Sequence, residues 1–212
     1  MSAARASTPE QVAVPPLESG DVMTRVEFHR RYSMHPEIKK AELIEGVVFV
    51  SSPLKAKGHG DEDLDMTAWL GAYRARTPGV RGSANATVIL DNDNEVQPDI
   101  SLRWVEEGST HLTPDGYVAG PPELVVEIAG SSVSRDMHQK LAAYQRNGVQ
   151  EYIVWRVEDA AIDWFVLEDG RYRKLEPDAD GIVSSRVFPG LRLDVAAMLA
   201  GDLAKVLAVQ TG

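Results

Sequence analysis

Two carboxylates in otherwise apolar strand segments are the residues best suited to chemistry. Asp99 lies in the segment Val96 to Trp104, where apolar and polar residues alternate. Alternate side chains of a strand face opposite sides of a sheet, so Asp99 shares a polar face with Gln97, Ser101 and Arg103. Glu127 interrupts the apolar run Leu124 to Ala129. Because a buried charge is costly unless it is paired or binds a metal, Glu127 is either half of a structural ion pair or part of a functional site.

A lysine that could join these carboxylates follows in the next helical segment. Asp136 and Lys140 are four residues apart and therefore lie on one face of a helix expected from Ser134 to Asn147. One strand-to-helix connection separates Glu127 from this helix, so the Lys140 amine can return to the same end of the sheet. The simpler alternative is an exposed Asp136–Lys140 pair, which stabilises a helix by only about 0.2–0.5 kcal/mol.

Two carboxylates and a lysine at one sheet edge suit metal-assisted hydrolysis of a phosphodiester bond. Carboxylate oxygens bind hard divalent ions such as Mg²⁺ or Mn²⁺. Such an ion polarises the phosphate and lowers the pKa of the attacking water, while a lysine stabilises the developing negative charge.

The order of the expected helices and strands, which must position these residues, predicts one α/β domain with a mixed sheet. We expect a disordered tail over residues 1–20 and a single domain over residues 21–212. The capping box Thr24 to Glu27, the helix-ending Gly148 and the turn Asp169-Gly170 mark element boundaries. Helices are expected at 24–32, 59–76, 134–147 and after 194; strands at 41–52 (two, joined by a turn), 84–90, 96–104, 124–129, 151–157, 162–167 and 171–175.

The composition narrows the classes of function. The 212 residues include 22 Lys and Arg against 32 Asp and Glu, a net charge of −10, which opposes broad nonspecific binding to nucleic acid but not a local site whose charge a metal offsets. The absence of Cys excludes a disulfide framework, a thiolate zinc site and a cysteine nucleophile. No segment has the length of a membrane span or the pattern of a secretory signal, so we expect a cytoplasmic protein.

Four segments, in this order, resemble a known family. The segments are AELIEGVVFVSSP, QPDISL, PPELVVEIAGSS and RDMHQKLAAYQRNGVQEYIV. Together they resemble the Uma-type putative restriction endonuclease family of the PD-(D/E)xK nuclease superfamily, over a range from about Met23 to Leu199. The resemblance implies a mixed β-sheet flanked by helices, a restriction-endonuclease-like core, and a divalent metal site.

The resemblance also implies roles for individual residues. Asp99 matches the family's metal-binding aspartate, and Glu127 matches its second acidic ligand. The superfamily's usual lysine position holds Ala129, and Lys140 fits the place on the following helix to which this family moves that lysine. Glu45 matches an acidic position in the N-terminal hairpin and is the candidate third metal ligand. The residues expected to support these groups are His59, Gln97, Asp136 and Tyr152.

One departure from the family pattern concerns the strand after the second helix. The family frequently has an aspartate there, and in this chain Tyr152-Ile153-Val154-Trp155-Arg156 ends in an arginine. If that aspartate only ends a strand, nothing is lost. If it orients the lysine, activity is affected.

The sequence therefore predicts a Mg²⁺- or Mn²⁺-dependent endonuclease that hydrolyses DNA, with Asp99, Glu127 and Lys140 as its catalytic residues. Two alternatives stay open: a catalytically inactive protein on the nuclease fold that binds a partner or regulates, and a nuclease that acts on RNA. Because two active sites would suit the cutting of both strands, a homodimer is a further hypothesis.

Overall fold

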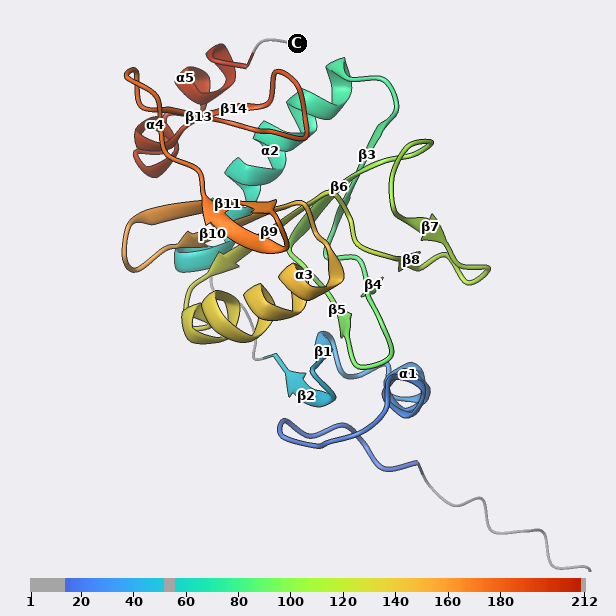
Figure 1. Ribbon diagram of the computed structural model, residues 1–212. Coiled ribbons are helices and arrows are strands. Elements are labelled where there is room, and N and C mark those ends of the chain that lie inside the picture. The colour runs from blue at the N-terminus through green and yellow to red at the C-terminus, as the bar shows by residue number, and fades with distance from the viewer. Residues whose placement is uncertain (1–13, 52–55, 211–212) are drawn as a thin grey trace, which may run out of the picture.

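A six-stranded mixed sheet forms the centre of the computed structural model, which describes residues 14–51 and 56–210 (Figure 1). Its strand order is β12-β11-β10-β9-β6-β3, and every neighbouring pair is antiparallel except β9 and β10, which are parallel. The strands are β3 (Val80–Ala84), β6 (Ile100–Trp104), β9 (Leu124–Ala129), β10 (Glu151–Arg156), β11 (Ala161–Glu168) and β12 (Arg171–Lys174).

Helices cover both faces of this sheet. On one face lie α2 (Asp61–Arg76), α4 (Val195–Leu199) and α5 (Leu203–Ala208), with the short strands β13 (Ile182–Ser184) and β14 (Arg192–Asp194) beside them (Figure 1). On the other lies a continuous helical segment made of the π-helix η2 (Arg135–Lys140) and the α-helix α3 (Leu141–Asn147). Strand β9 serves both cores, because Val126 packs with the α2 side and Val125 with the α3 side. The expected fold class is confirmed.

A second, smaller sheet lies at the N-terminal end of the molecule. Its order is β2-β1-β5-β4-β8-β7, with β1 (Ala41–Ile44), β2 (Val47–Val50), β4 (Val88–Ile89), β5 (Glu95–Val96), β7 (His111–Leu112) and β8 (Val118–Ala119). Helix α1 (Arg25–Met34) packs here through the buried Phe28. Leu17 is also buried, and the Gly20 amide donates to the Val48 carbonyl, so packing extends before the boundary expected at residue 21. Residues 1–13 of the expected tail lie outside the described residues.

The segment expected to form one strand over 96–104 is divided between the two sheets. Strand β5 ends at Val96 in the small sheet and β6 begins at Ile100 in the central one. Pro98 lies in the gap and has no N–H for a ladder hydrogen bond, which accounts for the break. The expected strand 84–90 is likewise wrong, since β3 ends at Ala84 and β4 covers Val88–Ile89. This crossing between sheets places Asp99 at their junction.

The boundaries set by local signals are confirmed. The Thr24 hydroxyl accepts from the Glu27 amide at 3.4 Å, and Gly148 ends α3 with a φ of 83°. Asp169 and Gly170 both have positive φ, as the expected hairpin turn requires. The π-helical turn η1 (Ala56–Gly60) precedes α2. None of the helices within residues 14–51 and 56–210 is long and apolar enough to cross a membrane.

Candidate active site

Asp99 and Glu127 meet across the pairing of β6 with β9. Ile100 is opposite Val126 in the antiparallel register, so Asp99, the residue before Ile100, lies beside Glu127, the residue after Val126. Consistent with this, Asp99 Oδ2 accepts a hydrogen bond from the Ile128 amide at 2.8 Å. Both carboxylates are buried, with Asp99 2% and Glu127 3% exposed. The structure therefore brings together the two residues that the sequence proposed as metal ligands.

Two cationic or protonatable groups contact Asp99 from other elements. Lys40 Nζ, just before β1, lies 2.9 Å from Oδ1, and His59 Nε2, in η1, lies 3.4 Å from Oδ2. Burial opposes ionisation of Asp99, but the contact with His59 and the charge of Lys40 hold its pKa well below its usual range. The same contact raises the pKa of His59. Asp99 is therefore ionised at neutral pH.

Lys140 lies among the carboxylates on the α3 side of the sheet. Its Nζ is 2.8 Å from Glu127 Oε1, 2.8 Å from Glu42 Oε1 and 3.9 Å from Asp136 Oδ1. The Tyr144 hydroxyl donates to the same Glu127 oxygen at 2.8 Å. Lys140 and Asp136 are each 1% exposed, so the interpretation of this pair as an exposed surface pair is wrong. The ion pair between Glu127 and a helical lysine is present.

These groups form what we call the acidic cluster: Glu42, Asp99, Glu127 and Asp136, with Lys40 and Lys140. Four carboxylates face the ammonium groups of Lys40 and Lys140, and two further basic side chains contact them: His59 at Asp99, and Arg135, whose Nε lies 3.8 Å from Asp136 Oδ1. Burial raises the pKa of Glu127 to about 8 against the opposing charge of Lys140, and it also raises the pKa of Asp136. Glu42 stays ionised because the two lysines lower its pKa in spite of burial.

The residues expected to support the site contact the acidic cluster by different routes. His59 contacts Asp99, as described above. The Gln97 backbone amide donates to Glu42 Oε1 at 2.8 Å, while its side-chain nitrogen lies 3.5 Å from Thr87 Oγ1. The Tyr152 hydroxyl donates to the carbonyl of Asp136 at 3.0 Å. Their placement is compatible with the supporting roles, which stay predictions.

Glu45 is not brought to the other candidate ligands. It lies in the turn between β1 and β2 with a φ of 53°, and its side chain is 42% exposed. Its carboxylate is 2.5 Å from Arg146 on the surface. The physical reason is the tight turn Glu45-Gly46, which directs this side chain away from the sheet junction. Glu42, three residues earlier on β1, occupies the buried position instead.

Sequence reasoning missed two members of the cluster, Glu42 and Lys40. Glu42 carried a usable signal, because it is an isolated acid in the apolar strand Ala41–Ile44, as Glu127 is in β9. Lys40 carried none, since nothing in the sequence separates it from the adjacent Lys39. Only the folded arrangement of β1 against the sheet junction places the Lys40 amine on Asp99.

The donor set is suited to a hard divalent cation. Glu42 Oε2 and Asp136 Oδ1 are buried without a hydrogen-bond partner, so the cluster has carboxylate oxygens that could accept a cation. Within residues 14–51 and 56–210, no three His, Asp or Glu side chains already surround a common ion position. Mg²⁺ does not require this, because proteins usually hold it with one or two carboxylates while water and substrate phosphate complete its shell. Asp99 and Glu127 fit that mode of binding.

Arg156, at the position of the family's aspartate, pairs with carboxylates outside the acidic cluster. Its Nε lies 2.7 Å from Asp163 Oδ2 on the neighbouring strand β11, and its guanidinium also pairs with Asp159. In this chain the end of β10 is therefore tied to β11 by a local ion pair.

Comparisons with known proteins identify the fold and the family of this chain. The crystal structure of a putative nuclease belonging to DUF820 from Anabaena variabilis ATCC 29413 matches with a TM-score of 0.66 at 15% identity, covering 84% of this chain and 98% of that one. At this identity the likeness shows the fold. No curated protein matches the chain. The model of the Uma2 family, described as "Putative restriction endonuclease", matches residues 25–196, and the chain belongs to this family.

Proposed function

We propose that this protein is a Mg²⁺- or Mn²⁺-dependent endonuclease that hydrolyses phosphodiester bonds in DNA. The observation that carries the proposal is the meeting of Asp99 and Glu127 at the sheet junction, beside a buried lysine. The family description and the nuclease-like fold support a nuclease in general. The choice of DNA and of these metals is our own.

In this proposal Asp99 and Glu127 hold the metal ion. When bound, the ion supplies Lewis-acid polarisation of the phosphate and a water of lowered pKa. Lys140 and Tyr144 donate to the same Glu127 oxygen and so fix the orientation of that carboxylate. Because the Lys140 amine lies 2.8 Å from both Glu42 and Glu127, we assign it this positioning role rather than contact with the phosphate.

Lys40 is the lysine of the cluster that reaches solvent. Its side chain is 17% exposed while its amine remains on Asp99, so it can contact a phosphate that approaches the site. A lysine there would stabilise the negative charge that develops on the phosphate oxygens in the transition state. Lys40→Met should therefore lower kcat more than it weakens metal binding.

The first experiment is calorimetric titration of Mn²⁺ into the wild-type protein, Asp99→Ala and Asp159→Ala. Asp159→Ala is the control, because it also removes a carboxylate but lies outside the cluster and is half exposed. We expect binding in the wild type and the control and none in Asp99→Ala. Plasmid cleavage with Mn²⁺ follows, with nicked and linear products lost in Asp99→Ala. Metal-dependent cleavage that persists in Asp99→Ala would disprove the proposal.

A second candidate function is a non-catalytic binding or regulatory protein on the same fold. One observation favours it: Asp99 and Glu127 already have lysine counter-charges, so the pair can persist as a structural ion network. Absence of Mn²⁺ binding in the wild type would favour this function. Metal binding with cleavage of RNA but not of DNA would instead assign an RNA nuclease.

A homodimer is part of the proposal, because two such sites could cut the two strands of a duplex. Sedimentation velocity at micromolar concentration tests this directly. A monomer under the conditions that support double-strand cleavage would exclude it.

A further inference from the structure

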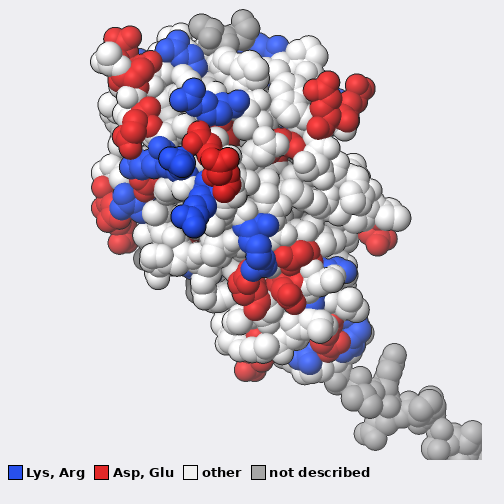
Figure 2. Space-filling model, in the orientation of Figure 1, with Lys and Arg blue, Asp and Glu red and all other residues white. Residues whose placement is uncertain are grey.

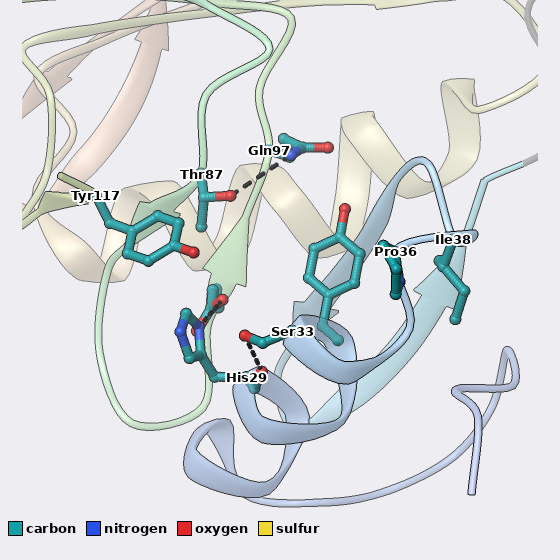
Figure 3. A pocket seen from close by; sticks show the side chains of 9 residues that line it. His29, Ser33, Pro36, Ile38, Thr87, Gln97 and Tyr117 are labelled. Carbon is teal, nitrogen blue, oxygen red and sulfur yellow. Dashed lines mark hydrogen bonds and ion pairs between the residues drawn. The ribbon is translucent and has the colours of Figure 1, made fainter. Parts of the chain in front are cut away.

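A pocket of about 260 Å³ lies beside the acidic cluster and is not used by the proposed metal chemistry. It lies between α1, the segment that follows it, and the small sheet (Figure 3). This volume is slightly below the roughly 300–1,000 Å³ of pockets that take drug-sized molecules. The pocket therefore suits one ring system rather than an extended chain.

Aromatic and apolar side chains form about half of the walls of this pocket, and polar groups form the rest. The His29 and Tyr117 rings meet edge to face, with centroids 5.1 Å apart, and Tyr32 is a further aromatic lining residue. Pro36 and Ile38 lie on the opposite side in Figure 3. The buried Glu95 carboxylate holds His29 in place, with Oε1 2.7 Å from Nδ1. These groups offer faces and edges on which a flat ring can stack.

Two polar side chains lie at one side of the pocket, and Ser33 and Glu95 are further polar residues of its lining. Gln97 and Thr87 lie next to each other in Figure 3, and the 3.5 Å between the Gln97 nitrogen and the Thr87 hydroxyl is a weak hydrogen bond that a ligand can replace. An amide offers a donor and an acceptor side by side, the pattern used to read the edge of a nucleobase. No Lys or Arg belongs to the described lining, so the pocket suits a neutral ring rather than a phosphate.

Gln97 connects this pocket to the acidic cluster. Its backbone amide donates to Glu42 Oε1 at 2.8 Å, and Asp99 is two residues further along the chain. Two residues span at most about 7 Å of backbone, so the pocket residue Gln97 and the cluster residue Asp99 are close neighbours in space.

We propose that this pocket binds an unpaired nucleobase of the substrate and so places the adjoining phosphate at the acidic cluster. The inference rests on the proposed nuclease function and adds a requirement to it. A base can enter the pocket only after it has left the helical stack, which costs least in single strands and at mismatches. The preferred substrate would then be single-stranded or locally unpaired nucleic acid.

The test uses nucleosides, which have no phosphate and need no metal ion. Saturation-transfer NMR with millimolar adenosine, cytidine, guanosine or thymidine would report contact with the wild-type protein in EDTA. We expect signal on the base protons of at least one nucleoside, and none on ribose alone. Tyr117→Leu, which removes one wall, should weaken the affinity about fivefold or more. Gln97→Leu is a second variant, since it keeps the backbone contact with Glu42.

Leu112→Ala is the matched control for Tyr117→Leu. Leu112 is exposed on the β7–β8 hairpin that also carries Tyr117, but it does not line the pocket. It should bind nucleosides as the wild type does. Absence of base signal in the wild type, or equal affinity in the wild type and both pocket variants, would overturn the proposal. Failure of the nuclease proposal has a different signature, namely no Asp99-dependent cleavage, because nucleoside binding requires neither Asp99 nor metal.

Discussion

Lys140 holds the acidic cluster together at the level of single residues. Its ammonium lies within 2.8 Å of both Glu42 and Glu127 in a region with almost no solvent exposure. Charges so deeply buried are tolerated when they are paired, and removal of one partner leaves the others uncompensated. This lysine therefore decides whether the carboxylates can remain charged in the folded protein.

Lys140→Met should destabilise the protein by about 3–5 kcal/mol, because it leaves buried carboxylates without their counter-charge. The free energy of unfolding in urea measures this. Lys174→Met is the control: Lys174 also pairs with a buried aspartate, but its side chain is 48% exposed, so its loss should cost no more than about 1 kcal/mol. Equal costs for the two variants would show that burial of the cluster has little energetic consequence.

The loss of unfolding free energy caused by Lys140→Met should depend on pH. The pKa of Glu127 is already raised by burial to about 8, and loss of the ammonium raises the pKa of Glu127 and its neighbours further. When the pKa of a carboxyl is higher in the folded protein than in the unfolded chain, the folded protein becomes less stable as pH rises above the unfolded pKa, which is 4.5 for Glu127. The difference from the wild type should therefore be smaller at pH 5 than at pH 8. A constant difference across this range would contradict the assignment.

Arg156 should matter for stability but not for metal binding, despite its departure from the family pattern. Its guanidinium contacts Asp163 and Asp159 and no member of the acidic cluster. Arg156→Ala should cost about 1 kcal/mol or less, since this ion pair is partly solvated. The Mn²⁺ affinity measured by calorimetry should stay within about twofold of the wild type. A tenfold loss of affinity would show that the position acts on the site.

At the scale of residues, a site residue could be predicted from the sequence when it is a charged residue in a segment that must be buried. Asp99 and Glu127 could be found because an acid in an apolar or alternating strand is a conflict that the fold must resolve. Glu42 rather than Glu45 joins the acidic cluster, because Glu45 lies in the turn while Glu42 is an isolated acid in the apolar strand β1. Lys40 depends on a contact between residues 59 positions apart, and no local pattern encodes such a contact.

At the scale of elements, the residues that end α3 also contact a residue of the site. Gly148 ends the helix, and Tyr144, one turn earlier, contacts Glu127. Tyr144 of α3 donates to Glu127, and the Val149 amide beyond the helix end donates to the Tyr144 carbonyl at 3.1 Å. Gly148 makes this ending feasible with a φ of 83°, a conformation that disfavours side chains. The end of α3 therefore affects how firmly Tyr144 is held.

Gly148→Ala should destabilise the protein by about 1–2 kcal/mol, the cost of a left-handed residue with a Cβ. The added Cβ would meet no atom within 4 Å, so strain is the whole effect. Gly71→Ala is the matched control in the exposed middle of α2, where the added Cβ also meets nothing within 4 Å. It should stabilise by about 0.5–1 kcal/mol, because glycine is a poor helix former. Thermal unfolding would reveal the opposite signs; a shared sign would refute the strain argument.

The elements also show where sequence reasoning reaches its limit. Caps, turns and the β10–β12 meander could be placed because each depends on neighbouring residues. The prediction of one strand over 96–104 was wrong. Both halves of the segment alternate as a strand should, but the chain passes from one sheet to the other at Pro98. Periodicity reports which side of a strand is polar, but it does not report which sheet the strand joins. The junction that forms the site was therefore not visible in the sequence.

At the scale of the whole molecule, charge is distributed differently on the surface and inside. The net charge is −10, yet the face seen in Figure 2 has acidic and basic residues interleaved rather than separated into one large field. The acidic cluster, by contrast, concentrates four carboxylates in a buried region. General screening by salt reaches surface charges readily, whereas buried charges are screened much less. A bound divalent ion should therefore stabilise the fold far more than monovalent salt.

The difference between stabilisation by a bound divalent ion and by monovalent salt can be measured as a shift in Tm. A ligand that binds the folded state alone stabilises it by about 2.7 kcal/mol at 100 times its Kd, which for a chain of this length corresponds to roughly 5–10 °C in Tm. We expect a shift of this size when Mn²⁺ is added to the wild type, and almost none with NaCl at equal ionic strength. Asp99→Asn, which keeps the shape of the side chain but removes its charge, should abolish the Mn²⁺ shift. Equal shifts from Mn²⁺ in the wild type and Asp99→Asn would mean that the ion binds surface carboxylates, and the acidic cluster would then be a structural ion network.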